Sequence, residues 1–319
     1  MIFSTHPLHP EITARLAAAG DYRVASAPTA EAVLAEGIAA EILIVRCPIP
    51  PAYFAAPGLR AAIRHGAGLD MIPMQAATNA GVLVANVPGA NAATVAEHAI
   101  FAAIALRRRF REMDAALRSK GWNDGRAYSE QGLELGGATL GILGYGNIGR
   151  ALHRLGAAFG MSVIAHTRRQ DAMPDHVQAV SMDDLVSKAD VLVLCCPLTE
   201  QTRGILTSPR IAAMKPGAVL INVARGPVID TDALIAALQT KRISAALDVF
   251  DVQPLPATSP LWALENVLLT PHMAGITADS MLRIGHVVAD EALRILSGAL
   301  PLNFCNPEVM PAYRARFPS

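Results

Sequence analysis

Short runs of apolar residues alternate with segments of helical character along most of the chain. The apolar runs are rich in Val, Ile, Leu and Ala. Continuous apolar strands between helices are typical of a parallel sheet that helices cover on both faces. The pattern predicts an α/β fold with strands at residues 41–45, 82–84, 140–143, 162–165, 191–194, 218–221, 244–247 and 267–269.

Three segments stand out as predicted helices. Residues 10–19 begin with Pro10 and are followed by Gly20, which are start and stop signals of a helix. A longer helix is expected from residue 94 to about residue 118, and another from about residue 278 to residue 296, before Gly298. The two long helices flank the central part of the chain. Such an arrangement is expected when one domain is inserted between two halves of another.

The composition fits a folded protein of one or two domains. Of the 319 residues, 52% are hydrophobic and 17% are charged. The 27 basic and 27 acidic residues cancel, and aromatic residues make up 5%, which argues against nucleic acid or a membrane surface as a partner. The basic cluster at residues 107–111 is either a nucleic-acid patch or a solvated or subunit-facing helix end. The second interpretation is favoured because helix C-termini stabilise cations.

The cysteines and the N-terminus bear on the compartment. The four cysteines are Cys47, Cys195, Cys196 and Cys305. None belongs to a CxxC pair, so the sequence predicts reduced, mostly buried thiols and no metal site. The first residues show no signal-peptide pattern, and no apolar run approaches the ~20 residues of a membrane span. A cytoplasmic protein is therefore expected.

A glycine-rich loop follows the strand predicted at residues 140–143. Gly144, Gly146 and Gly149 form a GxGxxG motif between that strand and a helix. The first glycine makes a tight turn, the second lets the backbone approach a pyrophosphate, and the third lets helix and strand pack closely. Amide groups at the helix N-terminus can then bind the anion. The motif predicts a dinucleotide-binding domain, with a purely structural turn as the alternative.

The next strand indicates which dinucleotide is bound. NAD-binding domains usually have Asp or Glu at its end, where the carboxylate accepts hydrogen bonds from the ribose 2′-hydroxyl. This chain has Thr167, Arg168 and Arg169. A hydroxyl and guanidinium groups can bind a 2′-phosphate, which a carboxylate would repel. The sequence therefore predicts NADP as cofactor. NAD is the alternative, if the two arginines are ordinary surface residues.

Six motifs resemble those of the D-isomer-specific 2-hydroxyacid dehydrogenases. They are RHGAGLD at residues 64–70, NVPGANAATVAEH at 86–98, GYGNIG at 144–149, NVARG at 222–226, ALDVF at 246–250 and TPHMAG at 270–275. The resemblance implies two Rossmann-like, doubly wound domains. The dinucleotide-binding domain, residues 93–273, is inserted into a discontinuous substrate domain of residues 1–92 and 274–319. A small 2-oxo acid substrate and a homodimer are also implied.

The resemblance assigns catalytic and substrate-binding roles. Arg225 matches the arginine that clamps the substrate's carboxylate and carbonyl, which suits a planar guanidinium. His272 matches the acid–base histidine that protonates the carbonyl oxygen during reduction. Ala67 and Gly68 match the loop whose backbone amides hold the substrate carboxylate. Arg46 is expected either to reach the distal end of the substrate or to lie on the surface.

The same resemblance places further residues at the cofactor. Besides the loop glycines and residues 167–169, these are Asn147 and Ile148 at the pyrophosphate, Pro197 beside the adenosine half, Val223 and Asp248 near the nicotinamide, and Gly275 in the last motif. Asp248 is expected to hold the carboxamide. Glu97 and His98 belong to a family motif but are interpreted as structural.

The chain departs from the family at one catalytic position. The glutamate that normally partners the histidine is replaced by Gln253. Glutamine can hold an imidazole in place but carries no charge that would stabilise imidazolium. Asp251 lies two residues away, on the same face if the segment is extended, but it matches no catalytic position of the family. Formate dehydrogenases of the superfamily have glutamine here, and formate oxidation needs no proton transfer by the histidine.

Three functions remain after these observations. The leading hypothesis is an NADPH-dependent reductase of a small 2-oxo acid such as glyoxylate or hydroxypyruvate. Formate oxidation is the alternative within the enzyme class, although the chain lacks the longer N-terminal region typical of formate dehydrogenases. A dinucleotide-sensing corepressor, which binds without turnover, is the third. The sequence lacks the low-complexity tails and the basic surface that would favour it.

Overall fold

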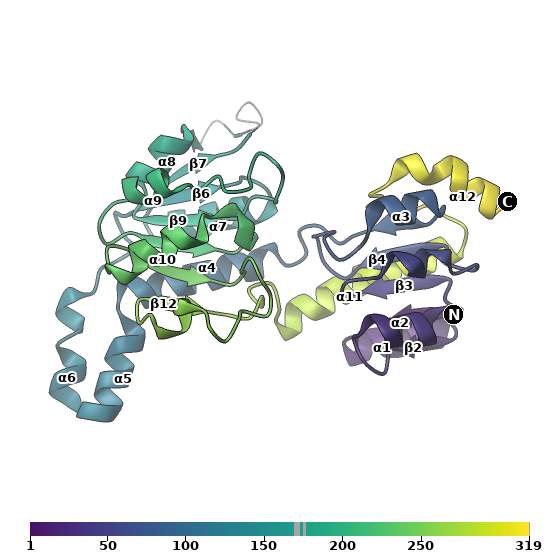
Figure 1. The fold of residues 1–319 in the computed structure, drawn as a ribbon, viewed down its shortest axis with the longest axis horizontal. Coiled ribbons are helices and arrows are strands. Elements are labelled where there is room, and N and C mark those ends of the chain that lie inside the picture. Colours follow the sequence, from purple (N-terminus) through teal and green to yellow (C-terminus); the bar gives the residue numbers. More distant parts are fainter. Residues whose placement is uncertain (169–172, 175–176, 319) are drawn as a thin grey trace. The chain divides into compact units, whose positions relative to one another are not determined.

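The computed structural model describes residues 1–168, 173–174 and 177–318. The chain divides into two compact units (Figure 1). The first comprises Met1–Asn91 and Ile276–Ser319, and the second comprises Ala92–Gly275. Each unit contains its own parallel sheet with helices on both faces, which confirms the predicted α/β class with two doubly wound units.

The first unit is built on a five-stranded parallel sheet in the order β2-β1-β3-β4-β5. Ile42 and Ile44 of the central strand pack against helices α1 and α11, whereas Leu43 and Val45 pack on the opposite face. Successive side chains of a strand point to opposite faces of the sheet. Because this strand is apolar at every position, both of its faces are buried. The elements are β1 (Ile2–Ser4), α1 (Pro10–Ala19), β2 (Tyr22–Val24), α2 (Ala30–Gly37), β3 (Ile42–Val45), β4 (Ala61–Arg64), α3 (Met74–Asn79), β5 (Leu83–Ala85), α11 (Ala278–Leu296) and α12 (Met310–Arg316).

The second unit has a seven-stranded parallel sheet in the order β12-β11-β10-β9-β6-β7-β8. The chain enters at β6, builds outward to β8 and crosses back to β9, so the strand order reverses between β6 and β9. Doubly wound folds bind ligands at the carboxyl ends of the strands at such a reversal. The strands are β6 (Thr139–Leu143), β7 (Ser162–His166), β8 (Gln178–Ala179), β9 (Val191–Leu194), β10 (Val219–Asn222), β11 (Ser244–Leu247) and β12 (Val267–Leu269). The helices are α4 (Ala92–Arg107), α5 (Phe110–Lys120), α6 (Trp122–Arg126), α7 (Asn147–Ala158), α8 (Met182–Lys188), α9 (Ser208–Ala213) and α10 (Thr231–Gln239).

The apolar runs located the strands well, but one predicted helix was wrong. Each predicted strand is present within one residue of its expected bounds. The single helix expected from residue 94 to about 118 is instead two helices, α4 and α5. The amide of Leu133 donates to the carbonyl of Arg107 at 2.8 Å, and Arg109 adopts a left-handed φ of 52°. A tertiary contact therefore ends α4, and the helical pattern of the sequence does not reveal it.

Helices α5 and α6 form a hairpin that extends from the rest of the second unit (Figure 1). The apolar side chains of Phe110, Leu117 and Trp122 on this hairpin are 56%, 42% and 70% exposed. These side chains leave apolar surface uncovered in the single chain.

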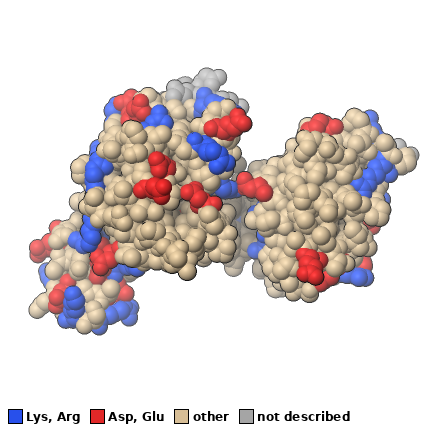
Figure 2. Space-filling view, in the orientation of Figure 1, with Lys and Arg blue, Asp and Glu red and all other residues tan. Residues whose placement is uncertain are grey.

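The basic cluster at the end of α4 makes contacts within the second unit. Arg107 and Arg111 donate hydrogen bonds to the carbonyl oxygens of Glu134 and Val267. Figure 2 shows acidic and basic side chains interspersed over the visible face. Both observations favour the helix-end interpretation of the cluster.

Three further features concern the described residues as a whole. The cysteines are free, and two of them are buried. No helix in the described ranges is long and apolar enough to span a bilayer. The same ranges contain no group of three or more His, Cys, Asp or Glu side chains that could hold a metal ion.

Candidate active site

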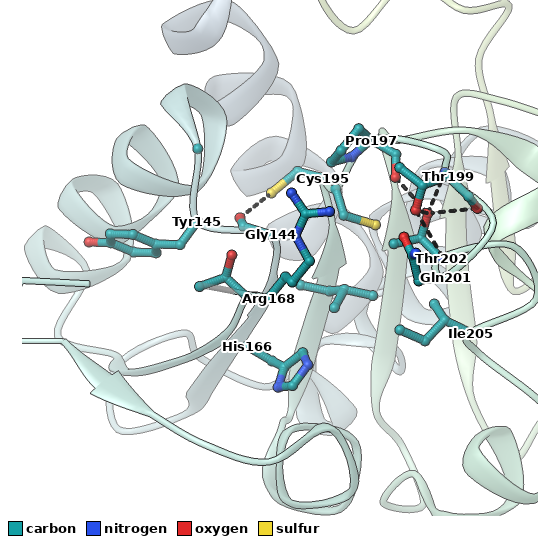
Figure 3. Close-up of a pocket in the computed structure, with 14 residues that line it drawn as sticks. Gly144, Tyr145, His166, Arg168, Cys195, Pro197, Thr199, Gln201, Thr202 and Ile205 are labelled. Atoms are coloured by element: carbon teal, nitrogen blue, oxygen red, sulfur yellow. Dashed lines mark hydrogen bonds between the residues drawn. The ribbon is translucent and has the colours of Figure 1, made fainter. Parts of the chain in front are cut away.

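A cavity of about 450 Å³ lies where the strand order of the second sheet reverses. Its walls come mainly from the ends of β6, β7 and β9 and the loops that follow them (Figure 3). Its volume falls in the range of small-molecule sites. None of the described side chains that line it is acidic. The cavity is therefore suited to an anionic ligand.

Each of the three loop glycines has different surroundings. Gly144 has φ 101°, and a Cβ there would lie 2.8 Å from the backbone of Cys196. A Cβ on Gly149 would lie 2.3 Å from the carbonyl oxygen of Gly144, because α7 packs against the loop. A Cβ on Gly146 would meet no atom within 4 Å. The surroundings match a tight turn, a close helix contact and an open approach for a ligand, respectively.

Helix α7 begins directly after this loop. Gly146 is its N-cap residue and supplies no side-chain cap, so no side chain of the cap competes for the first amide groups of the helix. Asn147 and Ile148 are the first two helical residues. A pyrophosphate beside Gly146 would meet these amides and the positive end of the helix dipole.

Thr167 and Arg168 line the same cavity from the end of β7. Arg168 is exposed, and Figure 3 shows its guanidinium directed over the cavity. Arg169, the other arginine predicted to bind the 2′-phosphate, lies outside the described residues.

The loop after β9 contains lining residues that the sequence did not single out. Pro197 lies at the cavity as predicted, and its carbonyl accepts a hydrogen bond from Thr202 Oγ1 at 2.7 Å. The same hydroxyl accepts a bond from the amide of Thr199 at 2.7 Å. Cys195 Sγ donates to the carbonyl of Gly144 at 3.0 Å and so ties this loop to the glycine loop. The Thr-x-x-Thr spacing after a proline could have indicated this closed turn.

Arg225 lies after β10 in a turn that Asn222 holds. Asn222 Oδ1 accepts a bond from the amide of Ala224 at 3.0 Å, and its Nδ2 donates to the carbonyl of Arg225 at 3.0 Å. The next residue, Gly226, passes so close to the loop after β11 that a Cβ would lie 2.1 Å from the carbonyl carbon of Phe250. This contact brings the loop of Arg225 against the loop that carries the predicted glutamine.

His272 and Gln253 are in direct contact. His272 Nδ1 lies 3.0 Å from Gln253 Oε1. Gln253 Nε2 donates to the carbonyl of Phe250 at 3.3 Å, which orients the amide oxygen toward the imidazole. A neutral His272 then carries its proton on Nδ1 and presents Nε2 on the other side of the ring. Asp251 instead accepts a hydrogen bond from Thr231 at 2.5 Å, so its carboxylate is tied to α10.

Asp248 organises the loop that carries His272. The residue is only 3% exposed. Its carboxylate accepts hydrogen bonds from Thr270 Oγ1 at 2.6 Å and from the amides of Met273 and Ala274 at 2.8 and 2.9 Å. Sequence reasoning placed Asp248 near the nicotinamide but missed this role. A Thr-Pro-His segment that follows a strand gives no signal of a contact with the neighbouring strand.

Val223 and Gly275 are the remaining residues of the predicted cofactor set, and His98 is a motif residue interpreted as structural. Val223 follows β10 and packs against the same core cluster as Ile148. Gly275 is the last residue of the second unit. His98 on α4 is half-buried; burial lowers its pKa, and the carboxylate of Asp248 acts in the opposite direction.

In the first unit, Ala67 and Gly68 lie in the loop after β4. Their carbonyl oxygens accept hydrogen bonds from Asn86 Nδ2 at 2.7 Å and Arg64 Nε at 3.1 Å. Among the described residues, their amide groups have no hydrogen-bond acceptor. The loop therefore presents two N–H donors.

Arg46 lies after β3, at the same carboxyl edge of the first sheet. Its Nη1 donates to the carbonyl of Pro7 at 2.8 Å, and burial lowers its pKa. Of the described carboxylates, none forms a salt bridge with it. Nearby His65 is 5% exposed, and its Nε2 has no hydrogen-bond partner in the described chain. Arg46 thus supplies a positive charge at this edge, beside a buried histidine.

Comparison with known proteins identifies the family. The profile of the D-isomer specific 2-hydroxyacid dehydrogenase, NAD binding domain, matches residues 100–274. The chain belongs to this family. Its second unit therefore binds a nicotinamide dinucleotide, in agreement with the glycine loop and the cavity.

Individual relatives cover most of the chain. The glyoxylate reductase of Aeropyrum pernix is 36% identical over 270 residues, which are 82% of this chain and 81% of that enzyme. The D-3-phosphoglycerate dehydrogenase of Methanocaldococcus jannaschii is 35% identical over 97% of this chain, but the match spans only 60% of that enzyme. The NADPH-dependent glyoxylate/hydroxypyruvate reductase of Sinorhizobium meliloti superposes with a TM-score of 0.85 at 27% identity, over 97% of this chain and 98% of that one.

Proposed function

We propose that this family member reduces a small 2-oxo acid to the D-2-hydroxy acid with NADPH. The observation that carries the proposal is the contact between His272 and Gln253, in the unit that also contains the dinucleotide cavity. A histidine held through Nδ1 directs Nε2 away from that partner, and Nε2 is the nitrogen through which a general acid would act on a carbonyl oxygen.

Each site residue has a task in this reaction. The amides of Ala67 and Gly68 bind the substrate carboxylate, and Arg225 binds the carboxylate and the carbonyl oxygen, where negative charge develops. When bound, the nicotinamide supplies the hydride to the carbonyl carbon. His272 donates the proton from Nε2 to the carbonyl oxygen, while Gln253 holds Nδ1.

The second unit would hold the dinucleotide along the carboxyl edge of its sheet. Asn147 and Ile148 would bind the pyrophosphate through their amides. The adenosine half would lie in the cavity between Arg168 and Pro197. Val223 and Asp248 would lie at the nicotinamide end.

A panel of substrates with both cofactors tests the proposal. We expect NADPH oxidation with glyoxylate or hydroxypyruvate, and loss of turnover in His272→Gln. Production of NADH from formate with no reduction of any 2-oxo acid would instead support the formate dehydrogenase-like function. Dinucleotide binding with no turnover in either assay would support a corepressor.

The cofactor preference rests on Arg168 and Thr167 at a cavity that lacks acidic side chains. We expect NADPH to be favoured over NADH by at least tenfold in kcat/KM, which corresponds to about 1.4 kcal/mol. A charge-assisted bond to the 2′-phosphate can supply that difference. The double variant Thr167→Asp with Arg168→Ala should reverse the preference. Equal use of both dinucleotides by the unchanged protein would contradict this part of the proposal.

Arg46 is proposed to bind the distal end of the substrate. Its guanidinium makes one hydrogen bond to the described chain and pairs with no described carboxylate, so it has donors to offer. Arg46→Met should raise the KM for hydroxypyruvate, which has a distal hydroxyl, more than the KM for glyoxylate, which has none. An equal effect on both substrates would place Arg46 outside the substrate site.

We further propose a homodimer in the cytoplasm. Exposed Phe110, Leu117 and Trp122 on the α5–α6 hairpin support the dimer, because water-exposed apolar side chains gathered on one element favour burial against another chain. Light scattering on the protein and on Trp122→Ser checks the oligomeric state. Free cysteines support a reducing compartment.

A further inference from the structure

The backbone of His272 has a conformation that is uncommon for residues other than glycine. Its φ is 55°, in the left-handed region that side chains other than glycine seldom adopt. Such a conformation persists only where the surrounding structure over-determines it. The contacts that hold it are therefore part of what aims the imidazole.

Most of those contacts come from Asp248. The amide of His272 donates to the carbonyl of Asp248 at 2.8 Å. The carboxylate of Asp248 then accepts the amides of the next two residues, Met273 and Ala274, at 2.8 and 2.9 Å. Asp248, which directly follows β11, thus accepts hydrogen bonds from the amides of three consecutive residues in the loop after β12.

The orientation of that carboxylate depends in turn on Thr270. Thr270 Oγ1 donates to Asp248 Oδ1 at 2.6 Å, the same oxygen that Met273 binds. A carboxylate has about four acceptor positions, and the loop fills three of them.

We propose that Thr270 is a positioning residue that aims His272 through Asp248. The hydroxyl sets the rotation of the carboxylate, and the carboxylate sets the path of residues 272–274. The imidazole then meets Gln253 through Nδ1 and the substrate through Nε2. This inference rests on the proposed function, because it assigns Thr270 a role in the proton transfer.

The test compares Thr270→Val with Thr270→Ser in the full chain. Valine keeps the shape of threonine and removes the hydroxyl, whereas serine keeps the hydroxyl. Thr240→Val is the matched control, since Thr240 Oγ1 donates to the carbonyl of Ala237 at the end of α10. If Thr270→Val does not fold, Thr270→Ala removes the same donor with less bulk.

The measurements are kcat and KM for the 2-oxo acid, the Kd for NADPH, and the melting temperature. We expect Thr270→Val to lower kcat by about 10- to 100-fold, the scale of a misplaced catalytic group, with KM and Kd within about twofold. Thr270→Ser and Thr240→Val should keep kcat close to that of the unchanged protein. An unchanged kcat in Thr270→Val, an equal loss in Thr270→Ser, or a rise in Kd as large as the fall in kcat would overturn the proposal.

A second readout separates this inference from the proposed function. The ring nitrogens of His272 can be followed by nitrogen-15 NMR, with His272→Gln for assignment. If the unchanged protein reduces no 2-oxo acid, the proposed function fails, but the positioning role is still decided by these signals. Thr270→Val should shift them and Thr270→Ser should not. Identical signals in both variants would overturn the positioning role.

Discussion

In the proposed reaction, Arg225 must supply both a positive charge and the fork geometry of a guanidinium. A lysine ammonium cannot bind a carboxylate and a carbonyl together in the fork geometry of a guanidinium. We expect Arg225→Lys to lower kcat/KM for the 2-oxo acid by ~10²-fold or more, the scale of removing a transition-state donor. Arg118→Lys, on exposed surface of α5, is the control and should change nothing. Near-normal kinetics in Arg225→Lys would show that it is not the clamp.

If the proposed reduction takes place, Gln253 should set its pH range through the contact with His272. The active form for reduction has His272 protonated, so activity is lost as the pH rises and the proton leaves. A carboxylate in place of the amide, at a position 3.0 Å from the ring, would stabilise imidazolium. In Gln253→Glu the basic limb of kcat/KM against pH should therefore move up by about one unit.

The matched control for that substitution is Gln178→Glu, which adds the same charge on exposed β8. The basic limb of kcat/KM against pH in Gln178→Glu should coincide with that of the unchanged protein. If the limb of Gln253→Glu also stays in place, proton transfer by His272 does not limit the reduction, and formate becomes the substrate to try.

At the scale of elements, packing between the glycine loop and α7 leaves no space for a side chain at Gly149 but leaves open space at Gly146. Gly149→Ala places a Cβ 2.3 Å from a backbone oxygen, so it should destabilise the second unit by about 1–3 kcal/mol, as overpacking does. Gly146→Ala places a Cβ in open space and should leave the melting temperature nearly unchanged. The same methyl group blocks the pyrophosphate, so the Kd for NADPH should rise at least tenfold. Unchanged NADPH binding in Gly146→Ala would contradict this division of roles.

At the scale of the whole molecule, His65 links stability to pH. Burial, together with the charge of Arg46, lowers the pKa of His65 to about 3, against ~6.5 in an unfolded chain. Between these values the unfolded state binds the extra proton, so the free energy of unfolding falls as the pH falls through this window. The slope is at most about 1.4 kcal/mol per pH unit.

Replacing this histidine isolates its effect. Urea unfolding at pH 7.5, 6.5, 5.5 and 4.5 should show a shallower loss of stability in His65→Gln than in the unchanged protein. At pH 7.5 and above, the difference between the two proteins should be constant, because His65 is neutral in both states. Parallel curves down to pH 4.5 would mean that His65 is not buried in solution.

The sequence by itself determined the features that repeat along the chain. Apolar runs located the strands, because a strand covered on both faces must be apolar at every position. The GxGxxG motif located the phosphate loop, since each glycine answers a local steric demand. Motif order located Arg225, His272 and Gln253 at the ends of three strands, and carboxyl ends of parallel strands share one edge of the sheet.

Only the tertiary structure decided the features that depend on partners far apart in the chain. The break between α4 and α5 comes from a bond between the backbones of Arg107 and Leu133. The left-handed backbone of His272 comes from Asp248, more than twenty residues earlier. Periodicity and motif spacing report local preferences, whereas the aim of a catalytic side chain depends on hydrogen bonds between neighbouring strands. Those bonds exist only once the sheet has formed.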